Sequence, residues 1–241
     1  MQVHWLACAL SLCVLTAPEG PGQLAFVSMR DGDPELYVVN DDGSNLHRLT
    51  HNPADDVSPT WSPDGSLLAF VTLRDGNQEI MVCKPDGSEA VNVTHHEALD
   101  VDPKFSPDGK LLAFRSHRTG TIDIHLCDLS NLSIRDVGQP GVWNEEPDWS
   151  PDGKRLLFAC SPGRNREVFV TDLASGASTN LTNHPAADWA PRWSPDGTKI
   201  AFLSRRDRGV RLYVMNADGG NVHEVSGGPV LDSPCDWRPH L

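Results

Sequence analysis

The chain has little positive charge for its size. Its 241 residues contain 20 Lys and Arg against 33 Asp and Glu, which gives a formal net charge of −13, and no basic run or stripe. Nucleic acids and anionic membrane surfaces attract proteins through clustered basic side chains. The composition therefore predicts neither kind of partner.

Long hydrophobic runs are also missing. The one sustained apolar stretch, Trp5 to Ala17, is shorter than the roughly 20 residues that span a bilayer, but it suits the core of a signal peptide. We therefore expect residues 1–21 to be a leader, the protein to be exported, and no segment to insert in a membrane. No Lys or Arg precedes the run, so a cytosolic chain with a misassigned start stays open.

Metal-binding and nucleophile motifs are absent from the sequence. It has no Cys-x-x-Cys pair and no Gly-x-Ser-x-Gly turn, so neither a metal site, a cofactor nor a catalytic residue is predicted. The cysteines beyond the leader are expected to be small buried residues, and whether any of them pair as disulfides stays open. They are Cys83, Cys127, Cys160 and Cys235.

What the sequence does contain is a repeat of 44 residues. The segment Trp-Ser-Pro-Asp-Gly at 61–65 returns at 105–109 (with Phe for Trp), 149–153 and 193–197, and Trp237 falls on the fifth beat. Each unit contains four short apolar runs separated by Pro, Asp and Gly turns, which is typical of a four-stranded antiparallel meander. Units of this length that stack radially form a β-propeller.

We therefore predict an all-β protein with one domain, residues 22–241, folded as a five-bladed β-propeller. The repeat opens at Leu24–Phe26 with the second strand of a blade and ends at Asp236–Arg238 with a first strand. The C-terminal strand is expected to join the N-terminal blade and close the ring, which would leave no free sheet edge.

The repeat resembles that of the TolB β-propeller family, also called WD40-like PD40 repeats. The resemblance rests on Trp-Ser-Pro-Asp-Gly, the following Ala-Phe, the Arg-Asp-Gly turn and the strand Leu36–Val39, and it covers residues 22–241. It implies a periplasmic protein that binds protein partners. The chain has five beats where the family's propeller has six, and it lacks the α/β domain that precedes that propeller.

The repeat provides an internal control, because a residue required by the fold recurs in every repeat unit. Four aspartates occupy equivalent positions of the repeat, and each has an Arg in its own blade. They are Asp56, Asp100, Asp188 and Asp232. The blade that has Asn144 instead has Pro162 in place of the Arg. This joint loss favours structural ion pairs over a cation site. The expected pairs are Asp56 with Arg74, Asp100 with Arg118, Asp188 with Arg206 and Asp232 with Arg30.

Residues that break the repeat are the candidates for binding a partner. Trp143 and Trp189 occupy repeat positions that otherwise lack aromatic residues, and both are expected on the rim of the central canal. Whether each indole anchors a partner or packs over its own loop stays open. Charged residues vary from blade to blade along the predicted innermost strands. The remaining candidates are Asp102, Lys104, Glu145, Glu146 and Arg192.

These residues predict a monomeric, non-catalytic scaffold that binds a protein or peptide in the cell envelope. The alternative is a glycan-active hydrolase or lyase that uses the carboxylates of Asp56, Asp100, Asp188 and Asp232. Pairing with Arg is expected to lower the pKa of these carboxyls, which suits a general acid poorly. Arg115, another departure from the repeat, is expected to pair with Asp123 or Glu146.

Overall fold

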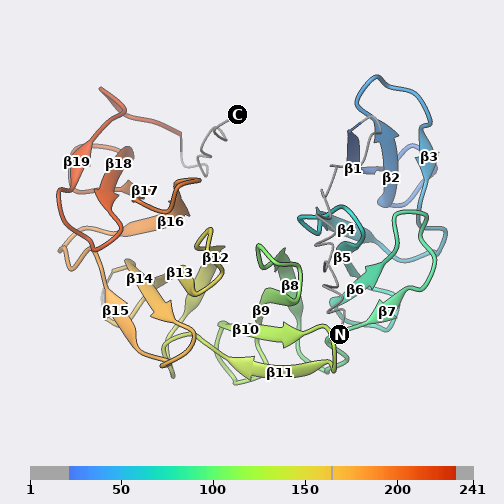
Figure 1. Ribbon diagram of the computed structural model, residues 1–241, viewed down its shortest axis with the longest axis horizontal. Helices are drawn as coiled ribbons and strands as arrows, with labels where there is room; N and C mark the ends of the chain where they lie inside the picture. The colour runs from blue at the N-terminus through green and yellow to red at the C-terminus, as the bar shows by residue number, and fades with distance from the viewer. Residues whose placement is uncertain (1–21, 164, 232–241) are drawn as a thin grey trace, which may run out of the picture.

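The computed structural model describes residues 22–163 and 165–231. This part of the chain forms five antiparallel sheets arranged along an arc around a common axis, as Figure 1 shows. The strand order within each sheet follows the chain, so every sheet is a meander. The predictions of an all-β fold and of one sheet per repeat are confirmed.

The first sheet has three strands among the described residues and the other four sheets have four each. The first sheet contains β1 (Gln23–Ser28), β2 (Glu35–Asn40) and β3 (His47–Arg48). The second contains β4 (Asp56–Trp61), β5 (Leu68–Thr72), β6 (Glu79–Cys83) and β7 (Val91–Asn92). The third contains β8 (Asp100–Phe105), β9 (Leu111–Ser116), β10 (Asp123–Asp128) and β11 (Ser133–Asp136).

The last two sheets repeat this pattern. The fourth contains β12 (Asn144–Trp149), β13 (Arg155–Cys160), β14 (Glu167–Asp172) and β15 (Ser178–Asn180). The fifth contains β16 (Asp188–Trp193), β17 (Lys199–Ser204), β18 (Arg211–Asn216) and β19 (His223–Glu224). The strands β4, β8, β12 and β16 lie on the inner side of the arc (Figure 1).

The predicted leader, residues 1–21, and the predicted closing strand around Trp237 lie outside the described residues. Pairing of that strand with β1 therefore stays a prediction, as does the assignment of the leader.

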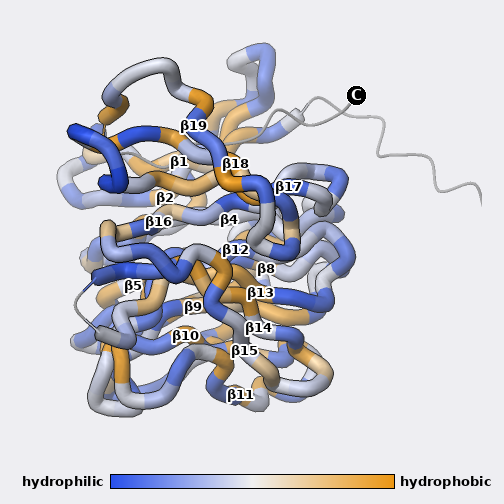
Figure 2. Tube along the Cα trace, turned by 90° about the vertical axis from the view of Figure 1, so that its left-hand side faces the viewer, coloured by the Kyte–Doolittle hydropathy of each residue, from blue (hydrophilic) through white to orange (hydrophobic). Residues whose placement is uncertain are grey.

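The core lies between and within the sheets, and the second strand of each of the last four units is buried along most of its length. The side chains of Phe70, Phe114, Phe158 and Phe202 are at most 1% exposed. Phe158 stacks on Phe169 at 6.0 Å between ring centroids, and Phe202 stacks on Tyr213 at 5.8 Å. Figure 2 shows hydrophobic stretches along the strands and mostly hydrophilic connecting turns.

The indole of Trp149 joins two sheets. It is 8% exposed, belongs to the core cluster of Leu156 and Phe158, and donates a hydrogen bond from Nε1 to the carbonyl oxygen of Lys104 at 3.1 Å. Because Lys104 belongs to the preceding unit, this recurring aromatic residue fixes neighbouring sheets to each other.

Each Ser-Pro-Asp-Gly turn is held by its own side chains. In the turn at Ser106–Gly109, the Ser106 hydroxyl donates to Asp108 Oδ1 at 2.7 Å and accepts the N–H of Leu111 at 3.0 Å. Gly109 has a φ of 71°, a left-handed conformation that favours glycine. The turn therefore has a structural explanation and needs no catalytic one.

Cys83, Cys127 and Cys160 are buried free thiols in three different sheets. They pack as small apolar residues, and burial raises the pKa of Cys83 to about 11. Cys235 lies outside the described residues.

Candidate functional site

The buried Asp column of the inner strands is paired with arginines. The Oδ2 atoms of Asp100 and Asp188 lie 2.9 and 2.8 Å from the Nη2 atoms of Arg118 and Arg206, respectively. Asp56 Oδ2 lies 3.9 Å from Arg74 Nη2. Each of the three Asp side chains is 0% exposed.

The fourth expected pair involves Asp232, which lies outside the described residues. Its expected partner, Arg30, donates from Nε to Ser28 Oγ at 3.0 Å and lies over the ring of Tyr37. This pair stays a prediction.

The pKa of the carboxyls of Asp100 and Asp188 is raised, not lowered as the sequence suggested. Burial raises the pKa of both Asp100 and Asp188, because loss of solvent outweighs the hydrogen bonds and the charge of the adjacent arginine. The prediction of a lowered pKa considered the charge of the arginine partner but not the complete burial of the carboxylate.

The fourth sheet shows what replaces the pair. Asn144 donates from Nδ2 to Asp123 Oδ1 at 3.0 Å and to the Gln139 carbonyl at 2.8 Å. Cys160 stands where Ser116 and Ser204 stand in the third and fifth sheets. A hydrogen-bonded contact between an amide and a carboxyl group thus fills the position where the other sheets place an Asp–Arg pair.

A cavity of about 380 Å³ opens between the inner strands, on the axis of the arc. It is lined by polar and charged side chains from β4, β8, β12 and β16, together with three prolines. Four of the seven predicted partner-binding residues line it: Asp102, Lys104, Glu146 and Arg192.

The backbone of the inner strands explains this lining. The pairing of each inner strand with the next strand shifts register at one point, for example between Val101 and Lys104. The residue at the shift has a left-handed backbone and precedes a proline. These residues are Ser58, Asp102, Glu146 and Ala190, with φ values of 54°, 56°, 57° and 52°.

The charges in the axial cavity are partly paired across sheets. Lys104 Nζ lies 3.4 Å from Asp148 Oδ1, and Asp148 Oδ2 accepts the N–H of Trp193 at 2.8 Å. Burial lowers the pKa of Lys104 and raises that of Asp148. Glu146 Oε2 accepts the N–H of Ala190 at 2.6 Å.

Glu145 belongs to a chain of charges beside the cavity. Arg115 Nη2 contacts Asp102 Oδ2 at 2.8 Å and its Nη1 lies 3.5 Å from Glu145 Oε1. Glu145 Oε2 in turn contacts Arg166 Nη2 at 2.8 Å. The predicted partners of Arg115, Asp123 and Glu146, were therefore wrong, because the Arg115 side chain reaches the acidic residues at the rim of its own and the next sheet.

The two tryptophans predicted on the rim have different environments. The Trp143 side chain is 56% exposed, as expected of a rim residue. Trp189 is 5% exposed and packs with Ala159, Ala190 and Leu203. Trp189 therefore fits the packed alternative, since its ring fills space between the fourth and fifth sheets.

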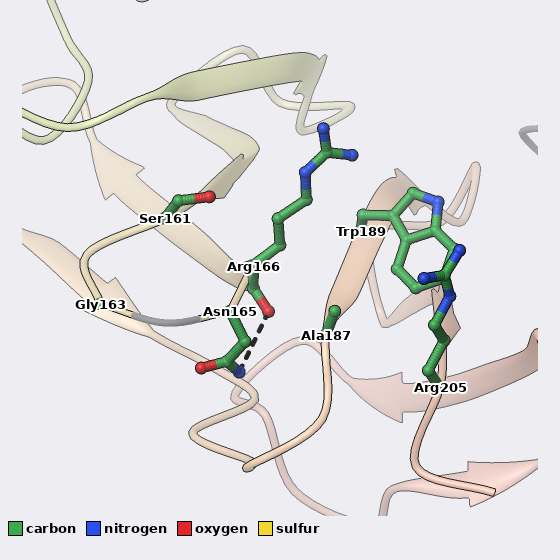
Figure 3. Close-up of a pocket in the computed structure, with 7 residues that line it drawn as sticks. All are labelled: Ser161, Gly163, Asn165, Arg166, Ala187, Trp189 and Arg205. Atoms are coloured by element: carbon green, nitrogen blue, oxygen red, sulfur yellow. Dashed lines mark hydrogen bonds between the residues drawn. The ribbon is translucent and has the colours of Figure 1, made fainter.

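A second cavity, of about 420 Å³, lies between the fourth and fifth sheets and was not predicted. Figure 3 shows Arg166 on one side of this cavity, and Trp189 with Arg205 stacked over it on the other. The Arg205 Cζ lies 5.3 Å from the centre of the Trp189 ring. The lining residues are Ser161, Gly163, Asn165, Arg166, Ala187, Trp189 and Arg205.

Two further properties concern only the part of the chain that the structure describes. There, no three His, Cys, Asp or Glu side chains gather as a cation site. The same residues include no helix long and apolar enough to cross a bilayer.

Comparison with known proteins identifies the repeat. A family model described as the TolB beta propeller domain matches residues 16–95, 57–146 and 78–239. The Tol-Pal system protein TolB of Geobacter sulfurreducens is 42% identical over 53 residues, which cover 21% of this chain and 12% of that relative. The matched segment is thus a small part of the relative's length.

Solved structures share the architecture. The structure of a putative TolB from Agrobacterium tumefaciens matches with a TM-score of 0.65 and 25% identity, over 79% of this chain and 73% of that one. An oligogalacturonate lyase in complex with manganese matches with a TM-score of 0.69 and 16% identity, over 84% of this chain and 61% of that one. The second likeness shows the fold alone.

Proposed function

Because the chain belongs to the TolB β-propeller family, we propose that it is a non-catalytic scaffold that binds a protein or peptide partner in the cell envelope. The relative from Geobacter sulfurreducens is named for the Tol-Pal system, which supports a protein partner and a periplasmic location. The apolar stretch Trp5 to Ala17 supports export.

The observation that carries the proposal is the lining of the axial cavity. Its charged side chains differ from blade to blade, although the backbone around them repeats. If the fold required a particular charge at these positions, that charge would recur in every repeat unit. Varied charges on a repeated backbone support recognition of a polar or charged partner, as does the exposed indole of Trp143, which directly precedes β12.

The glycan-active alternative has weaker support. Its candidate carboxylates Asp56, Asp100 and Asp188 are fully buried and paired with arginines. Burial raises the pKa of Asp100 and Asp188, as a general acid requires, but a 0% exposed carboxyl does not reach a glycosidic oxygen. Asp232, the fourth candidate, lies outside the described residues.

Site-specific photo-cross-linking tests the scaffold. The amino acid p-benzoylphenylalanine replaces Trp143 in one variant and Leu132, which is 43% exposed in the turn between β10 and β11, in a control. Irradiation in an envelope extract of the source organism should give a discrete protein adduct at position 143 only. An excess of unmodified chain should suppress it. Adducts at neither position, or equal adducts at both, would contradict the proposal.

A further inference from the structure

The cavity between the fourth and fifth sheets differs from its counterpart two repeats earlier. A cavity of about 280 Å³ lies at the equivalent place between the second and third sheets. There Gln78, Val101 and His117 stand 88 residues before Arg166, Trp189 and Arg205. The fold thus forms the same depression twice, and only the later one contains two arginines and an indole.

The backbone around this cavity is held firmly. Asn165 Nδ2 donates to the carbonyls of His184 and Ala186 at 2.8 and 3.0 Å, and to Glu167 Oε1 at 2.7 Å. These bonds fix the loop that carries Arg166 against the loop that leads into β16. Asn165 therefore supports the cavity wall and is not counted as a ligand-binding group.

Both guanidinium groups are oriented before any ligand arrives. Glu145 holds one Nη atom of Arg166, whose side chain is 40% exposed. The guanidinium of Arg205 lies over the ring of Trp189, and its backbone N–H, donating to the Ala187 carbonyl at 3.0 Å, fixes the start of the side chain. A guanidinium has five N–H donors in one plane, so stacking on an aromatic face is compatible with donation at its edge.

From this geometry we propose that the cavity binds a carboxylate of an acidic peptide segment. Arg166 and Arg205 would donate to the carboxylate oxygens, and adjacent apolar atoms of the peptide would contact Trp189. The volume of about 420 Å³ suits one or two side chains. The inference rests on the proposed function, since it assigns a recognition chemistry to the partner.

The net charge makes this place distinctive. The formal charge of the chain is −13, whereas two arginines line this cavity. An acidic segment is therefore directed here, and the interaction should weaken as salt screens it. The carboxylate has two possible sources, an acidic side chain or a chain terminus, which the experiment separates.

The test uses three short peptides and NMR of the full propeller. The probes are N-acetyl-Ala-Glu-Leu-Ala amide, its Gln analogue as the amide, and the Gln analogue with a free C-terminal carboxylate. The indole N–H signal of Trp189, assigned with Trp189→Phe, reports on the cavity. We expect a saturable shift with either carboxylate-bearing probe, and binding of the neutral amide at least about tenfold weaker.

Variants separate the cavity from general charge. Arg166→Gln introduces the residue found at Gln78, and Arg205→Gln likewise replaces a guanidinium with a neutral polar side chain. Each should weaken binding of the carboxylate probes at least about fivefold. Arg135→Gln, which removes an exposed charge from β11, should leave it unchanged. Equal binding of the neutral amide, unchanged affinity in both cavity variants, or no shift at about 10 mM probe would overturn the inference.

The two proposals fail differently. If the Trp143 cross-link forms but Arg166→Gln and Arg205→Gln do not alter probe binding, the cavity assignment is wrong and the scaffold stands. If the cross-link does not form, the scaffold itself is wrong. Saturation by only one carboxylate probe supports the inference and identifies the source of the carboxylate.

Discussion

Replacing His125 with Phe should make the protein less sensitive to acid. His125 is 0% exposed in β10, and its ring stacks on Phe114 at 5.6 Å between centroids. Its Nδ1 lies 2.7 Å from Asp136 Oδ1 on the neighbouring strand. Phe169 occupies the equivalent position in the fourth sheet, so a Phe at position 125 fits the repeat and keeps the stacked pair.

The size of the effect follows from the pKa of His125. Burial lowers this pKa from 6.5 to about 4, with help from the charges of Arg118 and His96, while Asp136 opposes the change. The unfolded chain therefore binds a proton near pH 6.5 and the folded one only near pH 4. The stability that depends on neutral His125 is complete above pH 6.5 and is lost as the pH falls toward 4.

Between about pH 7 and pH 4.5 this loss amounts to about 2 kcal/mol, at 1.36 kcal/mol per pKa unit. Urea unfolding of the wild-type protein and of His125→Phe, measured at both pH values, isolates the contribution of His125, because the other titrating groups contribute equally to both proteins. The wild-type protein should lose about 2 kcal/mol more than the variant on acidification. Equal losses would show that His125 titrates normally and would refute the reasoning.

Two further predictions concern the inner strands. Trp149→Ala should lower the free energy of unfolding by about 3 to 5 kcal/mol, because it leaves a cavity in the core, and should lower the thermal midpoint by about 6 to 20 °C. Trp143→Ala, at an exposed position, should shift the midpoint by only a few degrees at most. Equal shifts would contradict the assigned burial. Asp188→Ala should lower the free energy of unfolding by about 3 kcal/mol, since it leaves the guanidinium of Arg206 without its carboxylate partner. The double substitution with Arg206→Ala should lower it by less than the sum of the two single substitutions. A coupling energy near zero in a urea double-mutant cycle would show that the pair is not a unit.

The fold could be predicted because its information is periodic and local. A turn such as Ser106–Gly109 contains its own hydrogen-bonding side chains, and the recurring Phe and Trp residues mark the buried faces. The Asp and Arg columns similarly predicted which side chains meet. The pKa direction of Asp100 could not be predicted from its partner, since it depends on how completely the surrounding sheets exclude water.

The site was predicted less well, because it depends on distances between units. Trp189 breaks the repeat as Trp143 does, but it is buried because Ala159 and Leu203 leave room for its ring. The cavity beside it was missed, although the exchange of Gln78 and His117 for Arg166 and Arg205 is visible in the sequence. That exchange points to a cavity only once the two loops are known to face each other.

The left-handed residue before each inner-strand proline bears on how such a protein acquires new specificities. Ser58, Asp102, Glu146 and Ala190 share one backbone conformation although their side chains have nothing in common. The conformation therefore does not depend on the side chain, even though it is strained for any residue other than glycine. Each further unit of 44 residues places another such position on the inner strand of its sheet. Single substitutions can then change the side chain that an inner strand presents, one sheet at a time, while the strand pairing stays intact.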